Sequence, residues 1–343
     1  MAFLWMDSFD HMVGADLAAK YNTAGGTISA GAGRRGSAAY YANAGPAYTG
    51  GLTRTLAPAD NTCILGVAVK LGDVSSSGYY YFLGVLKAGT VQCSVNINAS
   101  GYLQLYRGDN GGTLLATAAT QPLIANTYSY VELKVVVHPS TGSATLRVDG
   151  TSVLTVPTAN TAAGGSAGWD QVRIGGNSFA IAYPSLDDYY VLDGSGSAPL
   201  NDFLGNVRVD AGYPTGAGAT TGWTPSAGAN YACVDEATPN GDTDYVTASS
   251  SPLTDTYNVS DIPLPGAPIY GVQVSVYAKK TDAGSCTLAP VVRHSGTDYV
   301  GTGFAPATTY GYNTTPYGTN PGTGAAWTEA GFNAIEVGVK RTA

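Results

Sequence analysis

The sequence predicts an all-β protein made of two β-sandwich domains in series, the first of them jelly-roll-like. Charged residues make up only 12% of the chain, about half the usual share, so long helices with exposed Lys/Glu faces are not expected. The 46 glycines and 24 tyrosines suit short strands joined by tight turns. A strand over residues 185–193 also runs directly into Gly194-Ser195-Gly196-Ser197, which is typical of a flexible connection between domains.

The first predicted domain, residues 1–193, consists of apolar runs of strand length separated by turn residues. Residues 63–71 are nearly continuously apolar, which is typical of a central strand buried on both faces. Strands are predicted over residues 3–9, 38–42, 51–56, 63–71, 79–87, 91–98, 102–107, 128–138, 143–149, 153–156, 171–176 and 186–193. A helical turn is predicted over residues 14–21.

Alternation along the last of these strands predicts which of its side chains share a face. Leu186, Asp188 and Tyr190 are expected on one face. Tyr189 and Val191 are expected on the other face.

Residues 194–206 are predicted to form a linker, and residues 207–343 a second β-sandwich domain. Strands are predicted there over residues 233–234, 244–248, 254–259, 269–279, 287–294, 297–301 and 334–339, with a helical turn over 324–333. The two halves are alike in composition, and the sequence contains no short-period repeat.

A loop predicted over residues 310–320 is the best candidate for an interaction surface. Glycine and proline make it irregular, so its tyrosines are expected to be partly exposed and able to stack on sugars or to anchor an interface. The alternative is that alternating tyrosines pack one face of a sheet. The candidate residues are Tyr310, Tyr312, Asn313, Tyr317, Asn320 and, in the following turn, Trp327.

The charge balance excludes two classes of partner. A formal charge of −8 and a pI of about 4.7 argue against binding to the nucleic-acid backbone or to an anionic membrane. No apolar run approaches the ~18 residues of a membrane-spanning helix, and residues 1–7 lack the features of a signal peptide, so synthesis in a cytoplasm is expected.

Two groups of charged residues are candidates for chemistry. Asp187-Asp188 could contribute to a calcium site, because Ca²⁺ prefers hard oxygen ligands. The favoured interpretation is that these carboxylates bond backbone amides at a strand end, so no cofactor is predicted. Arg34-Arg35 is interpreted as a solvated loop, with contact to an acidic partner subunit as the alternative.

The remaining reactive residue types show no catalytic arrangement. His11, His138 and His294 are scattered and form no triad motif, so structural roles are expected. Cys63 and Cys93 in the first half, and Cys233 and Cys286 in the second, lack zinc-site spacing and are expected to be reduced thiols.

The first 193 residues resemble the concanavalin A-like (laminin-G/glucanase-type) jelly rolls. The opening strand Leu4-Trp5-Met6-Asp7-Ser8-Phe9, the closing strand Leu186-Asp187-Asp188-Tyr189-Tyr190-Val191 and the hairpin over residues 134–149 carry this resemblance. The glucanase branch of that family holds its catalytic carboxylates in a Glu-x-Asp-x-x-Glu motif. This sequence has no such motif, and Glu132 is the only glutamate in the first domain, so the resemblance does not imply an enzyme.

The whole chain also resembles virion proteins of tailed bacteriophages. The segments that carry this resemblance are Asp193-Gly194-Ser195-Gly196, residues 201–209 and residues 320–328. It implies a non-enzymatic structural component of a bacteriophage particle, tail-associated or of the capsid-decoration or fibre type. Such a component docks on other virion proteins as a homo-oligomer or in many copies. The alternative function is a carbohydrate-binding module whose first sandwich recognises a glycan of the host surface.

Overall fold

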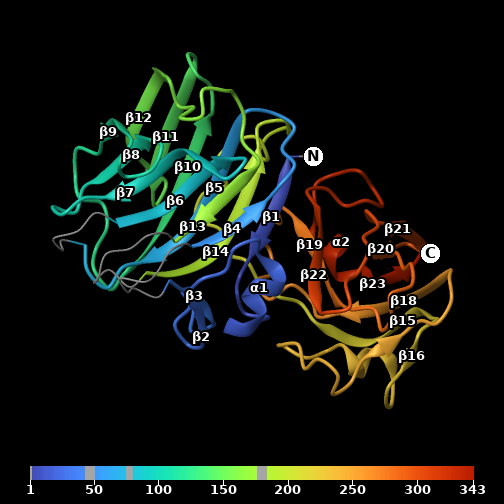
Figure 1. Ribbon diagram of the computed structural model, residues 1–343. Helices are drawn as coiled ribbons and strands as arrows, with labels where there is room; N and C mark the ends of the chain where they lie inside the picture. Colours follow the sequence, from blue (N-terminus) through green and yellow to red (C-terminus); the bar gives the residue numbers. More distant parts are fainter. Residues whose placement is uncertain (1, 43–50, 75–79, 176–183) are drawn as a thin grey trace. The chain divides into compact units, whose positions relative to one another are not determined.

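The computed structural model describes residues 2–42, 51–74, 80–175 and 184–343 (Figure 1). The chain divides into two compact units, Met1–Val209 and Asp210–Ala343. Strands dominate both units, and the α-helices among the described residues are the short α1 (Leu17–Lys20) and α2 (Glu329–Asn333). The predicted all-β class is therefore confirmed.

Unit 1 is a sandwich of two antiparallel sheets (Figure 1). The first sheet has the order β12-β11-β10-β5-β14-β3-β2, with β1 also paired to β14, and the second has the order β4-β13-β6-β7-β8-β9. The bounds in the first sheet are β1 (Phe3–Asp7), β2 (Thr27–Ser29), β3 (Ala39–Tyr41), β5 (Thr62–Lys70), β10 (Tyr128–Val136), β11 (Gly142–Val148), β12 (Thr151–Ala159) and β14 (Ser185–Asp193). Those in the second are β4 (Leu52–Thr55), β6 (Tyr80–Lys87), β7 (Thr90–Ile97), β8 (Leu103–Arg107), β9 (Thr113–Thr117) and β13 (Gln171–Ile174).

Every strand predicted for the first domain is present with small shifts in its bounds, whereas β2 and β9 were not predicted. Tyr79 and Gly176, at the ends of two predicted strands, lie outside the described residues. Apolar side chains from both sheets form one buried cluster, to which Leu65 of β5, Leu133 of β10 and Val85 of β6 belong. The sequence of β5 is nearly continuously apolar because both of its faces are buried: Leu65 lies in this cluster, and Ile64 and Ala68 are buried on the other face.

A β-bulge in β14 makes the predicted alternation wrong. Asp188 has a left-handed backbone (φ 50°), and the pairing with β5 shifts between Asp187 and Tyr190. The extra residue puts Leu186 and Tyr189 into the same core cluster, although strict alternation separates them. Tyr190 instead stacks on Tyr130 of β10, with ring centroids 6.4 Å apart.

The predicted linker is also corrected, because residues 194–209 belong to unit 1. Residues 201–209, here called the strap, lie along the outer face of the first sheet. Leu204 N–H donates to the Tyr190 hydroxyl (3.2 Å), and Gly205 N–H donates to Glu132 Oε1 (2.8 Å). The residues that follow the Gly-Ser run are attached to the first sheet, so this run does not separate the two units. The boundary between the units lies between Val209 and Asp210.

Unit 2 has a five-stranded antiparallel sheet, a two-stranded ribbon β19-β22 and the short pair β16-β17. The order in the larger sheet is β15-β18-β23-β20-β21. The bounds are β15 (Pro214–Thr221), β16 (Thr224–Pro225), β17 (Val246–Thr247), β18 (Leu253–Val259), β19 (Val272–Ala278), β20 (Leu288–His294), β21 (Thr297–Val300), β22 (Gly311–Tyr317) and β23 (Glu336–Arg341). Val272 and Val274 of the ribbon pack with Val292 of β20, Trp327 and Ile335 to form the core.

Several predictions for this unit change. Most of the loop predicted over residues 310–320 is strand β22, because its tyrosines and threonines pair with β19 along the whole strand. Residues 230–233 form a 3₁₀ helix where a strand over 233–234 was predicted. The predicted helical turn is shorter than expected and begins after Thr328, whose hydroxyl accepts from Gly331 N–H (3.0 Å). Among the described residues, no helix is long and apolar enough to span a bilayer.

Candidate functional site

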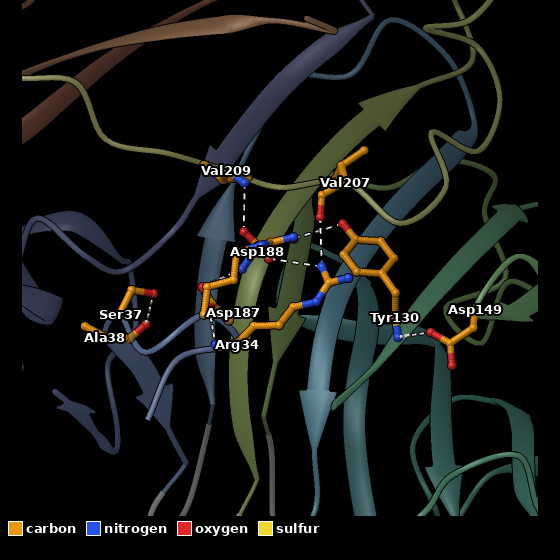
Figure 2. Close-up of polar contacts among 10 residues, drawn as sticks. Arg34, Ser37, Ala38, Tyr130, Asp149, Asp187, Asp188, Val207 and Val209 are labelled. Atoms are coloured by element: carbon orange, nitrogen blue, oxygen red, sulfur yellow. Dashed lines mark hydrogen bonds and ion pairs between the residues drawn. The ribbon is translucent and has the colours of Figure 1, made fainter. Parts of the chain in front are cut away.

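The two adjacent carboxylates of β14 lie at the bulge and are fully occupied by polar contacts (Figure 2). Asp187 accepts from the backbone N–H groups of Arg34 (2.8 Å) and Asp188 (2.7 Å). Asp188 Oδ2 accepts from Nη1 of Arg34 (3.0 Å) and of Arg35 (2.6 Å), and its Oδ1 accepts from Val209 N–H (2.7 Å). The favoured interpretation, carboxylates that bond backbone amides, agrees with these contacts.

Arg34 ties the bulge to the strap and to β10. Its Nη1 also donates to the Val207 carbonyl (2.9 Å), and its guanidinium lies 5.3 Å from the centroid of the Tyr130 ring. The Tyr130 hydroxyl in turn donates to the Asp188 carbonyl (2.9 Å). Both guanidiniums pair with Asp188 of the same chain. The interpretation as a solvated loop is therefore wrong for Arg34, which is 15% exposed, and agrees with Arg35, which is 38% exposed.

The acidity of Asp187 is strongly perturbed by its surroundings. Burial raises the pKa of Asp187 to about 7, and the neighbouring charge of Asp188 acts in the same direction. Its bonds to the Arg34 and Asp188 amides only partly offset these effects. Within the described part of the chain, no group of three or more His, Cys, Asp or Glu side chains is placed to hold a metal ion.

Replacing Asp187 by asparagine is expected to increase the stability of unit 1 relative to the wild type progressively as the pH rises from 5 to 8. Because its folded pKa is about 7 and its ordinary value 3.8, the stability tied to protonated Asp187 is complete below pH 3.8 and lost as pH rises through 7. The difference between these two pKa values corresponds to a loss of at most roughly 4 kcal/mol in the free energy of unfolding. Urea unfolding of both proteins at pH 5 and pH 8 measures it.

The titration of His11 is the reason for comparing the variant with the wild type, because the stability of the wild type alone also changes with pH through His11. Burial lowers the pKa of His11 to about 4, so it destabilises the fold as pH falls, opposite to Asp187. This contribution is common to the variant and the wild type and cancels in their difference. A difference that stays constant between pH 5 and pH 8 would show that Asp187 does not titrate in this range.

Glu132 lies in a second buried polar group on the outer face of the first sheet. Its Oε1 accepts from the Tyr190 hydroxyl (2.6 Å) and from Gly205 of the strap, and Oε2 has no hydrogen-bond partner. Lys134, on the same strand face, donates to the Asn201 carbonyl of the strap (3.1 Å). Glu132 thus holds the strap through Gly205 and Tyr190.

A third group, around Asp7 and Lys20, was missed by sequence reasoning. Lys20 Nζ lies 2.8 Å from Asp7 Oδ2, and neither side chain is exposed. The Tyr21 hydroxyl donates to Asp7 Oδ2 (2.6 Å), and His11 Nε2 lies 2.6 Å from Lys20 Nζ. The guanidinium of Arg54 stacks on the Trp5 ring, with its Cζ 4.1 Å from the ring centroid. Lys20 lies within the helical turn predicted over residues 14–21, and lysine is usually exposed to solvent, so nothing in the sequence indicated this burial.

The other histidines and the cysteines have structural positions. His138 Nδ1 accepts from Thr141 N–H (3.0 Å) in the turn before β11. The four cysteines are unpaired, as predicted. Burial raises the pKa of the Cys93 thiol to about 12, and it raises the pKa of the Cys63 thiol well above its usual value. Both thiols are therefore protonated and unreactive at neutral pH.

The structure separates the six candidate interaction residues into two groups. Tyr310 and Tyr312 come together around Tyr277 of β19, with centroid distances to its ring of 4.9 Å and 4.6 Å. The others face inward or are buried: Asn313 and Tyr317 lie on the ribbon face that includes Val272 and Val276, and Asn320 and Trp327 are only 3% and 4% exposed. Trp327 donates its indole N–H to the Tyr317 carbonyl (2.8 Å).

No family model and no curated protein matches this sequence. Solved structures with partial likeness include the cellulose-induced protein Cip1 (11% identity, 55% of this chain, 90% of that chain, TM-score 0.38). They also include an endo-β-1,4-glucuronan lyase of the fungus Trichoderma reesei (16%, 48%, 86%, 0.35) and the galectin LEC-6 of Caenorhabditis elegans (11%, 41%, 89%, 0.30). All three TM-scores are below 0.5, and these likenesses carry no conclusion about what this chain binds.

Proposed function

We propose that this chain is a non-enzymatic structural component of a bacteriophage particle, tail-associated or at the particle surface, that docks on other virion proteins. The observation that carries the proposal is the edge strand β9 of unit 1. It pairs with β8 alone among the described strands, contains no charged residue, and leaves Leu114 46% exposed. Edge strands of free-standing proteins are usually protected by charges, prolines or bulges. The pairing of β9 with β8 is irregular between Ala116 and Leu114, but β9 has neither a charge nor a proline, so it is suited to a permanent neighbour.

The contacts of the carboxylates in unit 1 support this proposal over a hydrolytic activity. Glu132, Asp187 and Asp188 are each bound by groups of their own unit and form no open pair of carboxylates. The resemblance of residues 193–196, 201–209 and 320–328 to tailed-phage virion proteins is the basis for naming the particle. Many copies on a symmetric particle would strengthen weak individual contacts through avidity.

Leu114→Lys is expected to reduce incorporation of the protein into particles at least tenfold, without changing its unfolding curve. A lysine at this position adds a charge to the β9 edge, where a neighbouring subunit would have to bury it. Quantitative immunoblotting of purified particles measures the effect. Leu264→Lys is the matched control, because Leu264 is 49% exposed in unit 2 and lies outside any strand.

Cryo-electron microscopy of the same particles tests the proposal itself. Ordered copies at regular positions, with β9 covered by a neighbour, are the expected result. Absence of the protein from particles would overturn the structural function. Normal incorporation of Leu114→Lys would overturn docking through β9.

A further inference from the structure

Asp7 and Lys20 bring a carboxylate and an amine into contact at a place in unit 1 that water does not reach. Asp7 ends β1 and Lys20 ends α1, and neither side chain is exposed where Lys20 Nζ lies 2.8 Å from Asp7 Oδ2. Groups held in a reactive arrangement behave as if present at about 10⁵–10⁸ M. An amine and a carboxyl fixed in this way can therefore condense to an amide, and the absence of water at the site opposes hydrolysis of the product.

His11 lies where this condensation requires a proton acceptor. Its Nε2 is 2.6 Å from Lys20 Nζ and 3.9 Å from Asp7 Oδ1, so the imidazole is next to both reacting groups. Burial lowers the pKa of His11 to about 4, which leaves the imidazole neutral and able to accept a proton at neutral pH. Burial also lowers the pKa of Lys20 below its usual value, which favours the uncharged, nucleophilic amine.

Both carboxyl oxygens of Asp7 also accept hydrogen bonds from fixed donors. The Phe9 N–H donates to Oδ1 (2.9 Å), and the Tyr21 hydroxyl donates to Oδ2 (2.6 Å). Such donors stabilise the negative charge that develops on a carboxyl oxygen when a nucleophile attacks its carbon. The ion pair of Lys134 with Asp202 (3.1 Å) differs, because its side chains are 33% and 57% exposed and remain in contact with water.

We propose that Lys20 and Asp7 condense to an isopeptide bond, with His11 as the catalytic proton carrier. Lys20 gives one proton to His11, which passes it to Asp7 Oδ1 after a small shift of the imidazole. The Nζ lone pair attacks Asp7 Cγ, and the Tyr21 hydroxyl stabilises the negative charge that Oδ2 gains. His11 takes the second proton from Nζ and delivers it to Oδ1, the Cγ–Oδ1 bond breaks, and one water leaves as the amide carbonyl forms on Oδ2.

The ion pair is the state of the chain before this reaction, and the amide is the state after it. Lys20→Met removes the ion pair from the unreacted chain and the amide from the reacted one, so either state is destabilised by this substitution. The bond involves contacts inside unit 1 and is independent of the docking proposed for β9.

Mass spectrometry of a tryptic digest of the unfolded full chain tests the bond. In the sequence, Lys20 is the first site of tryptic cleavage and Arg34 the next, and trypsin does not cleave after a lysine whose amine is part of an amide. We expect one peptide that ends at Arg34, uncut at Lys20 and lighter by one water than its sequence, with fragment ions that join residues 7 and 20. Lys20→Arg keeps the charge but has a poor nucleophile, so this variant should keep the full mass of its sequence. Lys134→Arg, at the exposed ion pair, is the matched control and should lose one water as the wild type does.

The rate of water loss tests the assignment of His11. In newly synthesised chains sampled over time, His11→Gln is expected to lose water at least tenfold more slowly than the wild type. Equal rates would overturn the assignment of His11 as the proton carrier. A wild-type chain that keeps its full mass and is cut after Lys20 would overturn the bond itself, whichever variants fold. Loss of water that persists in Lys20→Arg would place the dehydration elsewhere in the chain. Since Leu114→Lys tests docking through β9, the two proposals can fail separately.

Discussion

Lys20→Met is expected to destabilise unit 1 by about 3–5 kcal/mol, the range measured when one partner of a buried ion pair is removed. Burial by itself would raise the pKa of Asp7. The charge of Lys20, the charge that His11 carries when protonated, and hydrogen bonds from Lys20 and Tyr21 together more than offset this, so the pKa of Asp7 lies below its usual value. Methionine fills the space of the lysine stem and leaves the Asp7 carboxylate without its main counter-charge. Urea unfolding at pH 7 measures the loss.

The double variant Asp7→Asn/Lys20→Met distinguishes the contribution of the ion pair to stability from that of side-chain packing. Removing both charges also removes the uncompensated carboxylate, so the double variant is expected to be more stable than Lys20→Met alone. Asp7→Asn alone is expected to be destabilised as well, because it leaves a wholly buried ammonium beside Arg54. A cost of less than about 1 kcal/mol for Lys20→Met would mean that water reaches Asp7 and that the pair is not buried in solution.

Strands that contribute several core side chains were found from the sequence, whereas β15, which has no apolar face, was missed. β5 and β10 were recognised because each contributes several side chains to the core of unit 1. β15, Pro214–Thr221, is an edge strand of small residues whose side chains alternate only between half-buried and exposed. Its pairing with β18 depends on backbone hydrogen bonds, which leave no hydrophobic pattern in the sequence.

Tertiary contacts between distant residues account for the other errors. The bulge at Asp188 follows from its contacts with Arg34 and Val209, which no local pattern encodes. The strap looked like a linker because Gly194–Ser197 precedes it, although Leu204 then packs on the sheet. Tyr310 and Tyr312 were named as candidates because they are close in the sequence, whereas Tyr277, which contacts both rings, is distant in the sequence and was included only in a strand.

Asp188→Ala is expected to cost unit 1 about 4 kcal/mol and to release the strap. The change leaves the guanidinium of Arg34, only 15% exposed, without its carboxylate and leaves the Val209 N–H without an acceptor. It also puts alanine at a left-handed backbone position (φ 50°), which costs about 1 kcal/mol more than aspartate or asparagine does there. Arg35 is 38% exposed and adds little.

Two further substitutions at the same position separate these contributions. Asp188→Gly removes the carboxylate but suits the left-handed backbone, so it should be about 1 kcal/mol more stable than Asp188→Ala. Asp188→Asn keeps both the backbone preference and an acceptor for Val209, so it should be the mildest of the three. Hydrogen exchange at the amides of Leu204, Gly205 and Val209 reports on the strap directly. We expect these amides to lose protection in the alanine and glycine variants and to keep part of it in asparagine. Unchanged protection in Asp188→Ala would show that Glu132 and Tyr190 hold the strap without the bulge.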